Sequence, residues 1–276
     1  MENIPNVAVR YAVYFAIGYA LLVLVVFVLQ RNLIYFPDRE RPPADRLRSM
    51  GLQFWPDGSD FKGLISTAET FPAKGTVIVF HGNAGSAWHR DYYVHALEPL
   101  GYRVVLAEYP GYGGRRGKMN EKNAVADARE IISNARSQFG EPLFLLGESM
   151  GCGVAAAAAA DARQPISGLV MVTPWDSLPS LAQSHYWYLP ARWLVKDRFD
   201  SIANLQSFDR PVAVAMALND EVIPNKHTMA LFNAVKAPKR LWQFKNAGHN
   251  SWPTQPSAPW WKEVMAFVSA GSSVTD

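Results

Sequence analysis

The chain has 276 residues, of which 49% are hydrophobic and 18% are charged, and its formal net charge is +3 at pH 7. This composition supplies enough apolar material for a folded core and excludes a globally disordered chain. The small net charge, without a basic run or zinc-finger spacing, argues against nucleic acid as a partner. The length fits one α/β domain of about 200–250 residues with an appended segment.

A long apolar segment lies near the start of the chain. Residues 11–29 read YAVYFAIGYALLVLVVFVL and contain no charged side chain. At about 1.5 Å per residue, a helix of this length spans a bilayer core of roughly 30 Å. A signal peptide normally has a shorter apolar region that ends at a small-x-small cleavage site, whereas Arg31 and Asn32 follow here. We therefore expect an uncleaved transmembrane helix over about 11–29, rather than a signal peptide or a buried core helix.

This segment divides the chain into an anchor at 1–30, a linker at 31–50 and a catalytic domain at 51–276. Only Arg10 precedes the apolar segment, whereas several arginines follow it: Arg31, Arg39, Arg41, Arg46 and Arg48. The positive-inside rule then predicts a single-pass membrane protein with its large C-terminal part in the cytoplasm. In a bacterium the membrane would be the inner one.

Beyond residue 50 the sequence alternates between short apolar runs and helical patterns. The runs are rich in Val, Ile and Leu without period-two alternation, as is typical of parallel strands covered on both faces. The expected strands are 76–80, 102–107, 143–146, 168–172, 212–218 and 241–244. The expected helices are 87–100, 121–139, 154–162 and 226–235. This order predicts a doubly wound, mostly parallel α/β sheet, and the aromatic stretch 177–205 predicts a small helical cap over its carboxyl edge.

Ser149 lies between glycines directly after the expected strand 143–146. Residues 147–151, GESMG, match G-x-S-x-G, the nucleophile elbow in which a serine occupies a strained strand-to-helix turn. Small residues are needed on both sides because this turn brings the backbone close to its neighbours. A glycine-rich turn with an incidental serine would give the same local pattern. Cys152, the single cysteine, excludes an internal disulfide and is interpreted as a packing residue.

A second strand end, after 76–80, carries the loop HGNAGS at 81–86. In a hydrolase with this order of elements, that loop presents one backbone N–H to the developing oxyanion, and the residue after the nucleophile presents another. We assign the first donor to Asn83, with Ala84 as the alternative, and the second to Met150.

Two further strand ends carry an acid and a histidine. Asp220 follows the strand 212–218 and can orient a catalytic imidazole, although an aspartate before a helix also serves as a cap. Asp176, after the strand 168–172, is the alternative acid. His249 follows the last expected strand on a glycine-bearing loop, whereas the other histidines lie in helical, cap or loop patterns. The chain order serine, aspartate, histidine is the one expected for an α/β hydrolase.

The sequence resembles the α/β-hydrolase superfamily, and within it a branch of membrane-anchored hydrolases. That branch includes bacterial inner-membrane members and eukaryotic α/β-hydrolase-domain proteins, some of them protein depalmitoylases. The resemblance runs from about residue 11 to the C-terminus. It rests on the apolar N-terminal helix and on the motifs YFP (35–37), HGNAG (81–85), YPGYGG (109–114), GESMG (147–151), LNDEVIP (218–224) and AGH (247–249).

The resemblance implies an α/β-hydrolase fold with Ser149, Asp220 and His249 as catalytic residues and with Asn83 and Met150 as oxyanion donors. One departure is the sequence RRGKM at 115–119, where relatives tend to carry small and polar residues. Its cations would suit anionic lipid or substrate head groups, or simply a solvated loop.

These residues predict a membrane-anchored serine esterase or thioesterase that forms an acyl-enzyme. We expect lipase-like substrates, namely acyl esters, lipids or lipidated proteins, and no metal or organic cofactor, since no ligand cluster is evident. The alternatives are a serine peptidase of the same fold and a non-catalytic membrane-bound binding module; acyl length, leaving group and oligomeric state stay open. The aromatic residues expected to form an apolar acyl pocket, or else to pack the cap onto the sheet, are Trp175, Tyr186, Trp187, Tyr188 and Trp193.

Overall fold

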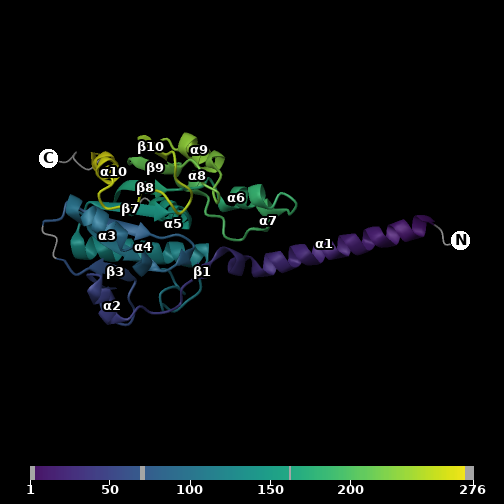
Figure 1. Ribbon diagram of the computed structural model, residues 1–276, viewed down its shortest axis with the longest axis horizontal. Helices are drawn as coiled ribbons and strands as arrows, with labels where there is room; N and C mark the ends of the chain where they lie inside the picture. Colours follow the sequence, from purple (N-terminus) through teal and green to yellow (C-terminus); the bar gives the residue numbers. More distant parts are fainter. Residues whose placement is uncertain (1–3, 69–71, 162, 271–276) are drawn as a thin grey trace.

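An eight-stranded sheet organises the computed structural model, which describes residues 4–68, 72–161 and 163–270 (Figure 1). The strand order is β10-β9-β8-β7-β4-β6-β3-β2. Neighbouring strands from β10 to β6 are parallel, whereas β3 is antiparallel to both β6 and β2. The strands are β2 (Leu52–Trp55), β3 (Gly63–Ser66), β4 (Thr76–Phe80), β6 (Arg103–Ala107), β7 (Leu143–Glu148), β8 (Ile166–Val172), β9 (Val212–Ala217) and β10 (Lys239–Phe244).

Helices cover both faces of this sheet. On one face, an apolar core takes side chains from α4 (Glu121–Phe139), α5 (Met150–Ala159) and α9 (Asn225–Ala234). On the other face, a second core takes side chains from α3 (Tyr92–Leu97) and α10 (Trp260–Ser269). Alternate residues of a strand point to opposite faces, so the central strands supply both cores and are buried at every position.

The observed elements differ from the expected ones in a few places. The stretch 87–100 is not one helix but α3 flanked by two 3-10 helices, Ala87–Arg90 and Glu98–Leu100. α5 begins at Met150 instead of residue 154, because the glycines that weaken a helix in isolation pack here against the sheet. The strands β2 and β3 and the helix α10 go beyond the expected set; each strand has four residues, too few for a clear periodicity.

α1 (Ile4–Ile34) projects from the sheet domain as one long helix (Figure 1). Its segment Val7–Ile34 is long and apolar enough to cross a membrane, and none of its most apolar 18-residue window is buried. The expected range 11–29 lies inside this helix, which continues for four residues, 31–34, into the expected linker. The rest of that linker contains β1 (Phe36–Pro37), which pairs with β5 (Ala84–Gly85), and the short helix α2 (Ala44–Ser49).

The cap packs alongside the C-terminal half of α1. It consists of three short helices, α6 (Leu178–His185), α7 (Ala191–Leu194) and α8 (Ser201–Asn204). The Tyr19 hydroxyl donates to the Tyr188 carbonyl over 2.9 Å. Further along α1, the Gln30 side chain donates to the Leu194 carbonyl over 3.2 Å and accepts from the Lys196 amide over 2.8 Å. The cap and α1 are therefore joined at both ends of their contact.

Asp197 fastens the last turns of α1 to the cap. The Arg31 Nε and Nη2 atoms each lie 3.0 Å from one carboxylate oxygen of Asp197, and the Tyr35 hydroxyl donates to the same carboxylate over 2.9 Å. Burial and the neighbouring Asp197 charge raise the pKa of Tyr35, so its hydroxyl stays protonated and available as a donor. The Asp197 side chain is only 5% exposed, so this contact is shielded from water.

We expect Asp197→Asn to lower the free energy of unfolding by about 1 kcal/mol, because it breaks the ion pair between a buried carboxylate and the Arg31 side chain, which is 46% exposed and keeps its charge. Thermal unfolding of the full chain in detergent micelles measures the change. The matched control is Asp209→Asn, because the Asp209 side chain is 85% exposed and pairs only with the neighbouring Arg210. Equal melting temperatures for the two variants would contradict the role assigned to Asp197.

Candidate active site

Three residues from separate loops meet at the carboxyl end of the sheet. The Ser149 Oγ lies 2.9 Å from His249 Nε2, and His249 Nδ1 lies 2.9 Å from Asp220 Oδ2. Ser149 follows β7, Asp220 follows β9 and His249 follows β10, so parallel strands of one sheet bring all three residues to one edge. This geometry lets the imidazole take the serine proton while the carboxylate stabilises the charge that results.

Ser149 occupies a strained turn between β7 and α5. Its φ is 52° and its ψ is −114°, a conformation that few non-glycine residues adopt. The flanking glycines permit it: a Cβ at Gly147 would lie 2.5 Å from the Cys152 Cα, and a Cβ at Gly151 would overlap the Phe80 carbonyl oxygen. The helix is thereby pressed against β4. Cys152 itself is buried, which raises the pKa of its thiol and fits a packing residue.

The loop that carries Asp220 is held by its own backbone. One Asp220 oxygen accepts hydrogen bonds from the amides of Val222 (2.9 Å) and Ile223 (2.7 Å). The next residue, Glu221, accepts the His249 amide over 3.0 Å, and this bond lowers the pKa of Glu221. Glu221 thus ties the acid loop to the histidine loop, a contact that the LNDEVIP motif does not reveal by itself.

The loop expected to supply one oxyanion donor borders the serine. A Cβ built at Gly82 would lie 3.7 Å from the Ser149 Cβ, so this loop borders the nucleophile. Within the described residues, the backbone N–H groups of Asn83 and Met150 have no protein acceptor. The Asn83 carbonyl, in contrast, accepts from the Phe36 amide (3.0 Å), and its side chain donates to the Ile34 carbonyl (2.8 Å). The contacts around Asn83 thus leave its N–H available for a ligand.

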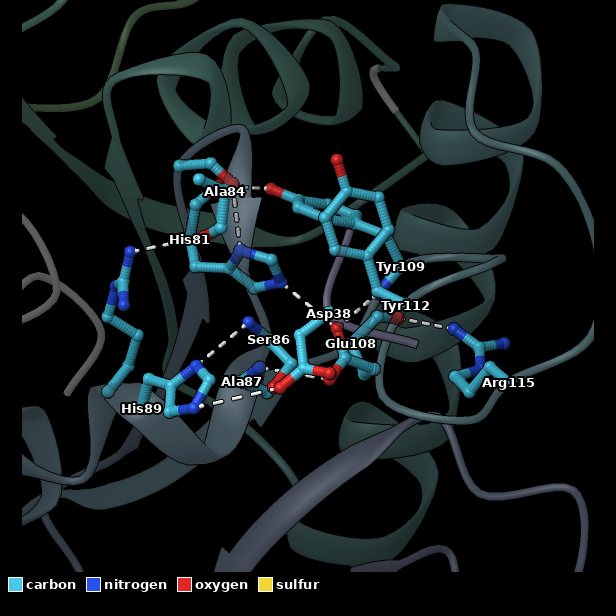
Figure 2. Close-up of polar contacts among 12 residues, drawn as sticks. Asp38, His81, Ala84, Ser86, Ala87, His89, Glu108, Tyr109, Tyr112 and Arg115 are labelled. Carbon is cyan, nitrogen blue, oxygen red and sulfur yellow. Dashed lines mark hydrogen bonds and ion pairs between the residues drawn. The ribbon is translucent and has the colours of Figure 1, made fainter. Parts of the chain in front are cut away.

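Glu108 holds the same loop at both ends. Figure 2 shows its carboxylate between His81, whose Nε2 lies 3.0 Å away, and the Ala87 amide, which donates over 2.9 Å. The Tyr109 hydroxyl donates to the His81 carbonyl over 2.7 Å, and the Tyr112 hydroxyl to the Asn83 carbonyl over 2.8 Å. Glu108 and His81 are almost fully buried. Sequence reasoning assigned no role to Glu108, although it directly precedes the YPGYGG motif.

Glu148, next to the nucleophile, is held by three side chains from the α3 region. The hydroxyls of Tyr92 and Tyr93 donate to its Oε2 over 2.7 and 2.9 Å, and the Arg90 Nε lies 3.3 Å from the same oxygen. Burial opposes the Arg90 charge, but Glu148 more than offsets this and raises the pKa of Arg90. These contacts attach the end of β7 to the face that carries α3.

A second set of serine, histidine and aspartate joins the cap to α9. His227 Nδ1 lies 2.9 Å from Asp176 Oδ1, and His227 Nε2 lies 3.0 Å from Ser184 Oγ. Ser184 lies inside α6, and its hydroxyl donates to the Leu181 carbonyl over 2.8 Å. Asp176, the alternative acid, therefore pairs with a different histidine, and Ser184 has neither the strained turn nor the glycines of an elbow.

Two of the five expected pocket aromatics, Tyr186 and Tyr188, line an apolar groove between the cap and α1, and the other three do not. Trp175 is 5% exposed and donates to the Phe199 carbonyl over 3.3 Å, so it packs the cap onto the sheet. The other four lie on the outside of the cap: Tyr186, Trp187, Tyr188 and Trp193 are between 51% and 79% exposed. α1 lies beside the α6–α7 region and shares this groove with it.

That groove has a volume of about 340 Å³ and runs between α1 and the cap. Almost all of its lining is apolar, and Gln30 is the one amide side chain among the lining residues. The α1 side of the groove is formed by Leu22, Val26, Phe27, Gln30, Leu33 and Ile34. The Ile34 carbonyl also accepts a hydrogen bond from the Asn83 side chain. One end of the groove therefore reaches the loop 81–86, which is expected to supply an oxyanion donor and is called the oxyanion loop below. Among the residues that the structure describes, no group of three or more His, Cys, Asp or Glu side chains could hold a metal ion.

Comparison with known proteins agrees with this geometry. The α/β-hydrolase fold family matches residues 75–207. The uncharacterized protein Rv2307c of Mycobacterium tuberculosis is 32% identical over 236 residues, which cover 83% of each chain. The chain belongs to the α/β-hydrolase family. The lysophosphatidylserine lipase ABHD12 of Danio rerio is 30% identical over 193 residues, 63% of this chain and 50% of that protein.

Among solved structures, the Pyrococcus furiosus esterase Pf2001 aligns with a TM-score of 0.67 at 16% identity. The alignment covers 87% of this chain and 98% of the esterase. Paleococcus ferrophilus monoacylglycerol lipase aligns over 72% of this chain and 96% of its own, with a TM-score of 0.55 at 21% identity. At these identities the similarity concerns the fold, and it confirms the predicted α/β-hydrolase architecture.

We expect Gly151→Ala to lower the free energy of unfolding by about 1–3 kcal/mol, because the new methyl group would overlap the Phe80 carbonyl and push α5 away from β4. Thermal unfolding in detergent measures this change. Gly18→Ala is the matched control, since no atom lies within 4 Å of a Cβ at that helical position. A Gly151→Ala protein as stable as the control would contradict the close approach.

Proposed function

We propose that the protein is a serine hydrolase that cleaves carboxylic ester or thioester bonds through an acyl-enzyme. The observation that carries this proposal is the 2.9 Å contact between Ser149 Oγ and His249 Nε2, made from a strained turn beside two free backbone N–H groups. The esterase and lipase names among the related proteins and solved structures support it. The catalytic residues are Ser149, Asp220 and His249.

In the proposed reaction, His249 Nε2 takes the hydroxyl proton as Ser149 Oγ attacks the substrate carbonyl carbon. The carbonyl oxygen gains the negative charge and accepts hydrogen bonds from the Asn83 and Met150 amides. The intermediate then expels the alcohol or thiol, which receives the proton from His249, and leaves an ester on Ser149. Water, deprotonated by the same imidazole, attacks this ester, and the acid product leaves as the serine regains its proton.

The proposed substrates carry an acyl chain and come from a membrane. The groove between α1 and the cap is apolar and approaches the oxyanion loop, which suits an alkyl chain whose carbonyl lies at Ser149. We propose that α1 is the membrane anchor and that the catalytic domain lies on the cytoplasmic side, as the arginines after the span favour. The exposed Trp187 and Trp193 share a pocket with Tyr19, near the middle of that span, so they would lie among the lipid acyl chains.

We expect Ser149→Ala to abolish labelling by a fluorophosphonate probe and to lower the hydrolysis rate of p-nitrophenyl esters by at least about a thousandfold. The chain offers a matched control in Ser184→Ala, which removes the serine of the other serine, histidine and aspartate set. Ser184 lacks an elbow and neighbouring oxyanion donors, so this variant should keep its labelling. A folded wild-type protein that takes no label would overturn the hydrolase proposal in favour of a binding module.

A second expectation concerns the groove. Val26→Trp should fill part of it and lower kcat/KM for p-nitrophenyl palmitate by about tenfold relative to the butanoate, because the longer chain loses its apolar site. Val25→Trp is the control, because it introduces the same side chain on α1 at an exposed position that does not line the groove. If both variants hydrolyse palmitate at the wild-type rate, the acyl chain lies elsewhere.

A further inference from the structure

A cleft of about 700 Å³ lies beside the last turn of α1, bordered by the segment that follows that helix and by the loop after β6. Its lining includes five cationic side chains and no carboxylate. Arg31 and Arg39 come from the end of α1 and the segment beyond it, whereas Arg115, Arg116 and Lys118 come from the β6–α4 loop. The fold thus gathers cations that are some 80 residues apart in the sequence, as their numbers show.

Two of these cations are held in place by carboxylates outside the cleft. Arg31 is paired with Asp197, and the Arg115 Nη1 and Nη2 atoms lie 2.6 and 2.8 Å from the Asp127 oxygens. Arg115 also donates to the Glu108 carbonyl, as Figure 2 shows. The other three, Arg39, Arg116 and Lys118, are exposed and form no ion pair within the described part of the chain. Three positive charges in the cleft are therefore left without a protein counterion.

Two of the acids nearest to the cleft along the chain face other groups, and the third, Glu40, is exposed and is not among the lining residues. Asp38, next to Arg39, lies 3.8 Å from His89 Nε2 (Figure 2). Glu121, at the start of α4, accepts the backbone amides of Arg198 and Phe199 over 2.6 and 2.9 Å. The cleft therefore keeps its positive field, and an anion is the ligand that this field favours.

The position of the cleft at the end of α1 favours a membrane lipid as the source of that anion. It opens at the end of the helix that we propose spans the membrane, where phospholipid head groups lie. One of its walls is Tyr112, whose hydroxyl donates to the Asn83 carbonyl, so the cleft also borders the oxyanion loop. A head group bound there would sit beside the reaction centre rather than on a remote surface.

We propose that this cleft binds the phosphate-bearing head group of one anionic phospholipid at the membrane surface. Arg116, Lys118 and Arg39 contact the phosphate, and the fixed Arg31 and Arg115 supply the surrounding positive field. The proposal rests on the membrane anchor of the proposed function but not on catalysis. It gives the RRGKM sequence, the departure from the family pattern, a binding role.

Native mass spectrometry of the full chain in a neutral detergent tests the proposal, because it resolves single bound lipids. All proteins carry Ser149→Ala, so that no lipid is hydrolysed and failure of the catalytic proposal does not affect the result. The probes are phosphatidylglycerol and phosphatidylcholine with identical acyl chains. We expect one phosphatidylglycerol to be retained in preference to phosphatidylcholine. Equal retention of the two lipids would overturn the proposal.

The variant Arg116→Gln/Lys118→Gln should weaken phosphatidylglycerol binding by about thirtyfold, as expected for the loss of two cations near an anionic head group. The matched control, Lys245→Gln/Lys262→Gln, removes the same charge from exposed positions outside the cleft and should change binding less than about twofold. An equal loss in both variants would reduce the effect to net charge and overturn the proposal. Complete displacement by millimolar inorganic phosphate would make the cleft a site for free phosphate and would overturn the lipid assignment.

Discussion

The close approach of α5 to the end of β4 is the constraint on which the arrangement of the active-site residues depends. Because Gly151 has no side chain, the first turn of the helix can pack against the Phe80 carbonyl, and the chain must turn sharply at Ser149 to enter it. That turn lifts the hydroxyl above the sheet edge and leaves the Met150 N–H unpaired beside it. The loop after β4 then lies against the serine, so the same contact that strains the backbone also brings the two N–H donors together.

Buried acids hold the loops around this point. Glu108 spans the oxyanion loop, Glu148 ties the end of β7 to α3, and Asp197 fixes the end of α1 to the cap. Each carboxylate interacts with at least two partners, which offsets the cost of burying its charge.

The sequence predicted the parts of the site that follow directly from a strand. Ser149, Asp220 and His249 each follow an apolar run that forms a strand. The carboxyl ends of parallel strands lie at the same edge of the sheet, so residues that follow these strands meet there. The contacts of Glu108 and Glu221 could not be predicted, because they depend on how loops fold over one another rather than on periodicity. The cap aromatics were expected to form an acyl pocket or to pack the cap onto the sheet. Trp175 packs the cap, whereas Tyr186 and Tyr188 line the groove beside α1, a helix whose position periodicity does not predict. The contacts among Ser184, His227 and Asp176 were also not predicted. These residues have the same types as a catalytic triad and meet in the folded chain, but no sequence motif marks them.

The contacts between α1 and the cap extend from Tyr19 to Arg31, over about three turns of the helix. A helix held at both ends of such a stretch cannot act as a flexible tether, so the hydrolase domain turns and tilts together with its anchor. The orientation of α1 in a bilayer would therefore set the height of Ser149 above the lipid surface and the direction from which a substrate arrives. A fragment without α1 would lose one wall of the apolar groove and leave Asp197 without its arginine, so measurements on it would describe a different cavity from that of the intact chain.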